Sequence, residues 1–261
     1  MPMSPRLLRP RAAGGFNPTN ISGLALWLDP TVASSLTIST GVQTWSDLSG
    51  NGKNFTQSTG NNQPTLTTIG GKTALSFDGT NDHLLTTSTL FTGNSSFTFF
   101  QVFEGTFPGN GTALFTHRTA EGGADTNDIT VGLSANNGSN WAFGTLRTRV
   151  SAVRSAAPVN TDQRFDNVDA SGIGAVAVSG AFSASPTSTA WFRGTVANSS
   201  AGTSSLVSQV GMSLGCRNNA TRDLFYVGKM GEIIAYTRQL STSERRRVEA
   251  YLARKWGYTT A

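Results

Sequence analysis

The segment that most restricts the fold is Phe97–Phe103 (FTFFQVF), in which apolar side chains alternate onto both faces of an extended chain. Three of its phenylalanines would fall on one face of a strand, and Phe100 and Val102 on the other, because successive strand side chains point to opposite sides. A strand that is apolar on both faces belongs in the middle of a layered structure, where both faces are covered. The segment therefore predicts layered sheets.

Turn-forming clusters divide most of the remaining chain into short strand-like runs. Leu24–Leu28 stops at an Asp-Pro pair, and Val42–Trp45 stops at the cluster 46–52 (SDLSGNG), which contains an Asn-Gly pair. Further runs lie near Thr73–Phe77, Ala113–Thr116, Ile129–Leu133, Trp141–Leu146, Ile173–Val178, Ala190–Arg193, Val210–Leu214 and Phe225–Tyr236. Only 13% of the residues are charged, and the many Ser, Thr, Asn and Gly residues suit short strands and turns. We predict an all-β antiparallel sandwich or jelly roll, with a long loop over 151–170.

The hydrophobic period changes near residue 241. Ser241–Glu244 (STSE) is a capping box, in which the serine hydroxyl accepts from a helix amide and the glutamate returns a bond to the cap amide. On a helical wheel, one face holds Val248, Tyr251, Leu252 and Lys255, and Arg245, Arg246 and Glu249 lie away from it. We therefore predict a short amphipathic helix over 242–256, stopped by Gly257, that packs on the sandwich and completes a domain over 21–258.

Residues 1–20 form a separate region rich in proline and arginine. Proline is poorly tolerated in regular helices and central strands, so we expect an extended arm. Such an arm could order on a partner subunit, or it could be a disordered tail. The side chains expected to anchor it are Arg6, Leu7, Leu8, Arg9 and Arg11.

The formal charge of the chain is +5, and arginine supplies sixteen of its twenty basic residues. Arginine favours planar contacts with carboxylates, phosphates and aromatic faces, which is consistent with protein interfaces or anionic glycans as partners, although codon usage is an equal alternative. Basic residues are not interleaved with aromatic ones as a nucleic-acid groove requires. We therefore expect no nucleic-acid partner.

Cys216 is the only cysteine, so an internal disulfide is excluded, and this favours folding in a reducing cytosol. The first eleven residues are basic, yet no apolar stretch of signal-peptide length follows them. No run approaches the roughly 20 apolar residues of a membrane span. We expect folding in a cytoplasm and no membrane insertion.

Several segments resemble the concanavalin A-like lectin/glucanase superfamily, and more narrowly the LamG-type jelly-roll domains of tailed-phage virion proteins and bacterial surface proteins. These segments are Gly23–Asp29 (GLALWLD), Trp45–Gly52, Phe77–Asp82 (FDGTND), Gly231–Ser241 (GEIIAYTRQLS) and Tyr251–Gly257 (YLARKWG). The resemblance implies two antiparallel sheets packed face to face, with ligands on the concave face or the rim loops. The arm ahead of Phe16–Pro18 also resembles that of small phage structural proteins, which implies a virion component.

The carboxylates do not form the pattern of a glycosidase of this superfamily. Retaining glucanases carry a Glu-x-Asp-x-x-Glu strand, because their mechanism needs two carboxyl groups about 5 Å apart. The chain has five glutamates, and none has another carboxylate two residues away. His83 and His117 lie too far apart in sequence for a recognisable triad or zinc motif. We predict no catalytic residues and no enzyme activity, with a glycoside hydrolase as the least favoured alternative.

Two kinds of ligand site remain as predictions. Asp47, Asp78 and Asp82 could supply oxygen ligands to a calcium ion, the only cofactor considered, although Asp beside Gly is also ordinary turn chemistry. Trp141 and Trp191 follow polar, turn-rich sequence, unlike the other tryptophans, and could each stack on the apolar face of a sugar.

The first functional hypothesis is a structural or attachment module of a phage particle: a capsid decoration, head fibre or tail component, present in many copies or as a homo-oligomer. It would fold in the host cytoplasm, bind other virion proteins through the arm and display the sandwich on the virion. The second is a free carbohydrate-binding module that recognises a cell-surface glycan. A virion lectin would satisfy both.

Overall fold

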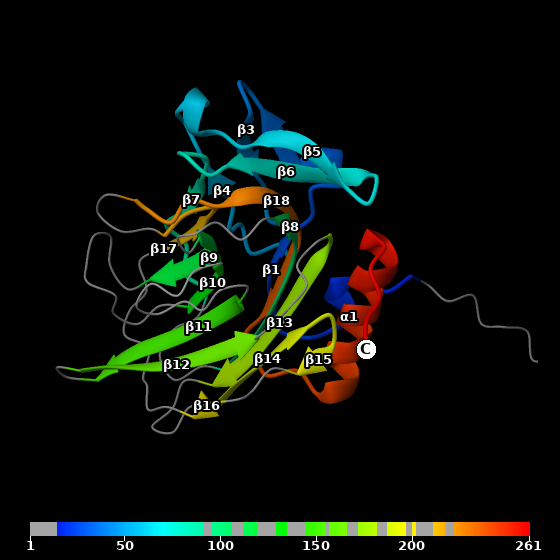
Figure 1. Ribbon diagram of the computed structural model, residues 1–261. Coiled ribbons are helices and arrows are strands. Elements are labelled where there is room, and N and C mark those ends of the chain that lie inside the picture. The colour runs from blue at the N-terminus through cyan, green and yellow to red at the C-terminus, as the bar shows by residue number, and fades with distance from the viewer. Residues whose placement is uncertain are drawn as a thin grey trace, which may run out of the picture.

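The computed structural model has two antiparallel sheets and one C-terminal α-helix, as predicted (Figure 1). It describes residues 15–90, 96–105, 112–118, 129–134, 145–154, 157–165, 172–181, 187–196, 200–201, 211–217 and 222–261. The arm residues Arg6, Leu7, Leu8, Arg9 and Arg11 and the tryptophan Trp141 lie outside these ranges. In the described part, no helix has the length and apolar character to cross a membrane.

Sheet A contains nine strands among the described residues. Its main order is β15 (Thr195–Val196), β14 (Thr187–Phe192), β13 (Gly174–Ala181), β8 (Ser96–Gly105), β18 (Val227–Tyr236), β6 (Lys72–Asp78) and β5 (Thr65–Ile69). Off this path, β1 (Leu24–Leu28) pairs with β18, and β16 (Ser200–Ala201) pairs with β14.

Sheet B also contains nine described strands. Their order is β12 (Ala157–Phe165), β11 (Thr145–Arg154), β10 (Ile129–Ser134), β9 (Thr112–Arg118), β17 (Gly211–Leu214), β7 (Leu84–Thr86), β4 (Phe55–Thr56), β3 (Val42–Trp45) and β2 (Leu36–Ile38). Short 3-10 turns occupy η1 (Pro18–Asn20), η2 (Ala33–Ser35) and η3 (Gly60–Asn62).

Strand β8 lies between two apolar layers, which confirms the prediction made from its sequence. Phe97, Phe99 and Phe103 belong to the core between the two sheets, where Phe99 meets Phe115 of sheet B with ring centroids 4.6 Å apart. Phe100 on the other face belongs to a second apolar cluster that also contains residues of the helix. The order of layers is therefore sheet B, main core, sheet A, second core and helix.

Helix α1 (Thr242–Trp256) has the predicted bounds. The Ser241 hydroxyl accepts from the Glu244 amide, the Glu244 carboxylate accepts from the Ser241 amide, and Gly257 ends the helix with a φ of +79°. Figure 1 shows α1 beside β1, β13 and β14, whereas β9, β10 and β17 lie on the opposite side. The sequence analysis was wrong about Arg245 and Glu249, which form an ion pair that is buried rather than turned to solvent.

Two further expectations are corrected. Most of the predicted loop over 151–170 is a hairpin, because β11 pairs with β12 from Leu146↔Phe165 to Arg154↔Ala157. Its polar sequence hid this, since the edge of a sheet tolerates charged strands and often uses them. The last residues of the predicted arm belong to the domain: η1 is capped by Asn17, and Phe16 packs on Tyr251 with ring centroids 5.2 Å apart.

Candidate ligand-binding site

Three of the segments that resemble the superfamily meet at Glu232 of β18. The carboxylate is fully buried and accepts hydrogen bonds from Trp27 Nε1 (2.7 Å), Tyr251 Oη (2.8 Å), Lys255 Nζ (2.7 Å) and Trp256 Nε1 (3.2 Å). Burial raises the pKa of this carboxyl, and the Lys255 ammonium opposes that effect. With four donors already bound, Glu232 joins α1 to sheet A and is not offered to a ligand.

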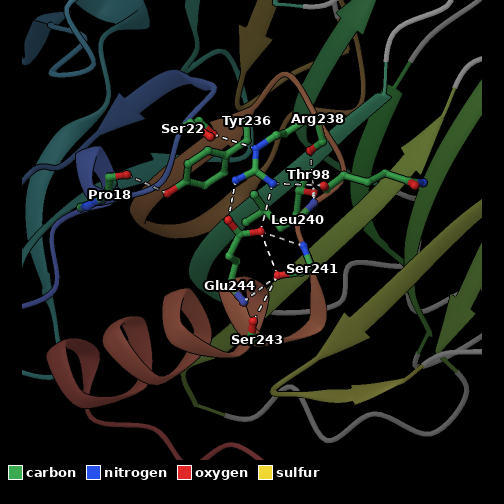
Figure 2. A network of polar contacts seen from close by, with 10 residues as sticks. Pro18, Ser22, Thr98, Tyr236, Arg238, Leu240, Ser241, Ser243 and Glu244 are labelled. Atoms are coloured by element: carbon green, nitrogen blue, oxygen red, sulfur yellow. Dashed lines mark hydrogen bonds and ion pairs between the residues drawn. The ribbon is translucent and has the colours of Figure 1, made fainter.

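The N-terminal end of α1 is held by a second polar network (Figure 2). Arg238 forms a bidentate ion pair with Glu244, at 2.6 and 3.0 Å, and donates from Nε to the Ser22 carbonyl at 3.0 Å. The Thr98 hydroxyl donates to the Arg238 carbonyl and accepts from the Leu240 amide, both at 3.0 Å. The Arg238 hydrogen bonds lower the pKa of Glu244 to about 2. This part of the resembling sequence is also structural.

The glutamates in the described part of the chain are all paired with bases. Glu104 binds Lys229 at 2.7 Å, and Glu249 binds Arg245. With Glu232 and Glu244 engaged as above, every glutamate of the described ranges has a cationic partner. Glu121 lies outside those ranges.

The carboxylate of Asp47 organises the turn over 46–52. Its oxygens accept from the amides of Trp27 (3.0 Å), Ser49 (2.9 Å) and Lys53 (3.1 Å), and from the Ser49 hydroxyl (2.8 Å). These donors occupy the lone pairs that a calcium ion would need. The turn chemistry that the sequence left as an alternative is the role seen here.

Asp78 and Asp82 lie together in a different turn. Asp78 Oδ1 accepts from the amides of Thr80 (2.8 Å), Asn81 (3.2 Å) and Asp82 (3.3 Å), and Asp82 Oδ2 accepts from the Asp78 amide (3.0 Å). Burial, with the like charge of Asp78, raises the pKa of Asp82 to about 6. The three predicted calcium ligands do not converge, and the described residues contain no group of three or more His, Cys, Asp or Glu suited to a metal.

Trp191 of β14 faces the helix layer. The Arg245 guanidinium lies 4.2 Å from its ring centroid, and the ring packs against the second apolar cluster. This cation–π contact covers one face of the ring, and the side chain is partly buried. Sugar stacking on Trp191 therefore stays a prediction.

A polar pocket of about 450 Å³ lies over β3, β4 and β7 of sheet B. Its lining residues are Gln43, Thr44, Thr56, Gln57, Ser58, Thr59, Asn62, His83, Leu85 and Arg222. Thr44 pairs with Thr56, and Thr56 with Leu85, across the three strands. The residues next to them in sequence, Trp45, Phe55 and Leu84, are in the main core. Because strand side chains alternate, the pocket lies on the outer face of sheet B, away from α1.

Hydrogen bonds hold the wall of the pocket at His83. His83 Nδ1 lies 2.7 Å from the Asn81 carbonyl and Nε2 lies 2.8 Å from the Gln57 side-chain nitrogen. Nδ1 therefore carries the proton, and Nε2 accepts from the Gln57 amide. Gln57 Oε1 accepts from the Thr59 amide at 2.9 Å, which fixes the orientation of the Gln57 side chain. Burial lowers the pKa of His83, and the positive charge of Arg222 lowers it further.

The described lining of the pocket offers amides, hydroxyls and one guanidinium, and it contains no carboxylate. Such groups can bind the hydroxyls of a polyhydroxylated ligand, but they supply no acid–base pair for hydrolysis. The sequence analysis considered His83 only for a triad or a zinc motif and did not single out Gln57 or Arg222. The pairing of β3, β4 and β7 brings Gln57 and His83 together, and Arg222 reaches the pocket from the segment before β18.

No protein-family model matches the chain, and no curated protein matches its sequence. Solved structures do resemble it. Domain 4 of AbnA, a GH43 extracellular arabinanase from Geobacillus stearothermophilus, in complex with arabinotriose, has a TM-score of 0.59 at 15% identity, over 87% of this chain and 97% of that one. The botulinum neurotoxin serotype G binding domain has a TM-score of 0.61 at 12% identity, over 90% of this chain and 54% of that one.

The binding domain of Paraclostridial Mosquitocidal Protein 1 has a TM-score of 0.57 at 14% identity, over 87% of this chain and 52% of that one. The chain thus spans about half the length of the toxin domains it resembles and nearly all of the arabinanase domain. At these identities the likeness shows the fold, a β-sandwich. The narrower resemblance to phage LamG-type domains stays a prediction.

Proposed function

We propose that this chain is a non-catalytic binding module that recognises a glycan in the polar pocket of sheet B. The observation that carries the proposal is the preorganised wall at His83, where Asn81, Gln57 and Thr59 hold the polar groups in place before any ligand arrives. Preorganised groups lose less conformational entropy on binding. The pocket volume of about 450 Å³ lies within the range of small-molecule sites.

The similar structures support the same class of function. The arabinanase domain is described in complex with arabinotriose, and the toxin domains are described as binding domains. A catalytic role receives no support from the pocket, because the lining residues that the structure describes include no carboxylate. The glutamates of the described ranges are engaged in ion pairs elsewhere.

To test the proposal, a bulky side chain is introduced into the pocket, and binding of the variant to immobilised bacterial surface polysaccharides and to arabinotriose is measured. Thr56 is exposed on the pocket floor, so Thr56→Trp blocks the site without removing a core contact. Thr65→Trp, at an exposed position of β5 in sheet A, is the matched control. We expect Thr56→Trp to lower affinity about tenfold or more, because it excludes the ligand, and Thr65→Trp to leave it unchanged. Equal binding by both variants would refute a ligand site here.

We further propose that residues 1–14 anchor this module to a phage particle, so that many copies display the sandwich on the virion after folding in the host cytoplasm. The support is the arm sequence, with Arg6, Leu7, Leu8, Arg9 and Arg11, and the lone buried thiol of Cys216. Because residues 15–20 pack on the domain, the variant to test lacks residues 1–14 and keeps residues 15–261. Co-sedimentation of the full chain, but not of the deletion, with undecorated particles would agree with this proposal. Equal sedimentation of both would refute it.

A further inference from the structure

Arg222 places a positive charge at the pocket. Its Nε is buried, and no acceptor for it lies among the residues that the structure describes. The adjacent carboxylate of Asp223 is already bound by both Nε and Nη2 of Arg217. Because Nε is covered, the atoms left to meet a ligand are the two Nη nitrogens of the guanidinium, which can donate in parallel to an acceptor with two oxygens.

The backbone holds Arg222 in an unfavourable conformation. Arg222 has a φ of +43° and Leu224 a φ of +51°, in the left-handed region that residues with a Cβ rarely adopt. Both flanks are fixed: the Arg217 amide donates to the Asp223 carbonyl at 2.8 Å, and the Ala113 amide donates to the Leu224 carbonyl at 2.8 Å. Strained residues of this kind concentrate at binding and catalytic sites, where the surrounding structure enforces them.

The described lining of the pocket carries one positive charge. None of the ten lining residues that the structure describes is acidic, and Arg222 is the only basic one among them apart from His83. His83 is neutral, because its Nδ1 donates to the Asn81 carbonyl and its Nε2 accepts from Gln57. A single guanidinium among neutral hydroxyls and amides favours a ligand with one negative charge and several hydroxyl groups.

We propose that the pocket binds a sugar that bears one carboxylate, such as a uronic or sialic acid, with the carboxylate at Arg222 and the sugar hydroxyls at Thr44, Thr56 and Asn62. This inference rests on the proposed glycan-binding function and specifies its ligand class. A carboxylate is planar and matches the two parallel N–H groups of a guanidinium edge. A phosphate monoester carries a charge of about −1.5 to −2 and would leave charge uncompensated in a pocket with one cation.

The test compares acidic sugars with their uncharged counterparts on the full chain. Galacturonate and sialyllactose, which carry one carboxylate each, are titrated calorimetrically beside their carboxyl-reduced forms, with a singly sulfated galactose oligosaccharide as a further probe. We expect at least one acidic sugar to bind about 10- to 100-fold more tightly than its reduced form, the range typical of a charge-assisted bidentate contact. Tighter binding of the sulfated probe than of every carboxylated one would overturn the proposal.

Three variants assign the preference to Arg222. Arg222→Gln should abolish the preference for the acidic sugar while the reduced form still binds, and Arg222→Lys should restore only part of it, because lysine keeps the charge but loses the planar fork. Arg246→Gln, at an exposed helix position, removes the same charge elsewhere and should have no effect. A folded Arg222→Gln variant that keeps the preference would overturn the inference.

The outcomes distinguish the glycan-binding function from the carboxylate preference. If acidic and reduced sugars bind equally and Thr56→Trp blocks both, the glycan-binding function stands and the carboxylate inference is wrong. If no sugar binds the wild-type chain, both are wrong. If Arg246→Gln weakens acidic-sugar binding as much as Arg222→Gln does, the preference comes from net charge and not from Arg222.

Discussion

The substitution Glu232→Gln tests whether the buried polar network holds helix α1 on sheet A. The carboxylate is fully buried and takes donors from β1 and α1, so it links two elements that are distant in sequence. Glutamine has nearly the same size and shape, but only one of its two terminal atoms can accept. Its amide nitrogen would face a second donor, either the ammonium of Lys255 or the indole of Trp256.

The expected loss of unfolding free energy in Glu232→Gln depends on which ion pairs of Lys255 remain. Breaking a buried ion pair by removing one partner costs about 3–5 kcal/mol, because the other charge is left uncompensated. Here Asp29 still lies 2.5 Å from Lys255 Nζ, so the ammonium keeps one partner. We therefore expect the lower part of that range, about 3 kcal/mol of unfolding free energy.

The assay is urea denaturation, followed by far-UV circular dichroism and tryptophan fluorescence. Glu104→Gln is the matched control, because Glu104 has a single lysine partner and its side chain is 32% exposed. A pair of that kind is worth about 0–1 kcal/mol. If Glu232→Gln lowers the unfolding free energy no more than Glu104→Gln does, the network is not what holds the helix. If Glu232→Gln fails to fold, Trp27→Phe removes one donor to the carboxylate and part of a ring packed on the second apolar cluster, and should cost at least about 1 kcal/mol.

Three further predictions concern groups that the sequence singled out. Asp82 has a pKa raised from 3.8 to about 6, so the folded state binds its proton more tightly than the unfolded state does, and ionised Asp82 lowers stability above pH 6. Asp82→Asn should therefore raise the unfolding free energy, measured by urea denaturation, by about 1–2 kcal/mol at pH 8, and this gain should vanish by pH 4. A lower unfolding free energy at both pH values would contradict this. Trp191→Ala should leave glycan binding unchanged but cost about 2–4 kcal/mol in denaturation, because the ring packs under Arg245; lost binding without lost stability would support the stacking hypothesis. Burial raises the pKa of Cys216 to about 12, so a thiol-reactive disulfide reagent should label it only after unfolding, and rapid labelling of the native protein would refute this.

The sequence by itself determined the layered fold and the helix. The double-faced pattern of Phe97–Phe103 requires cover on both sides, and the structure provides it with two apolar clusters. The capping box at Ser241 and the glycine at 257 set the ends of α1, because caps satisfy backbone groups within one turn of the helix. These signals are local, so they can be recognised without knowing what packs where.

Tertiary structure alone decided which polar residues are structural and which line the pocket. Arg245 and Glu249 looked exposed on the helical wheel, yet β14 brings Trp191 against them and buries the pair. The three aspartates looked like metal ligands, yet neighbouring amides occupy them. The pocket depends on the pairing of β4 with β7, next to His83, and on the antiparallel bridge between Arg217 and Asp223, next to Arg222. These two parts of the pocket are more than a hundred residues apart in the sequence. Local sequence carries no record of such long-range pairings, because each requires the whole sandwich to bring its segments together.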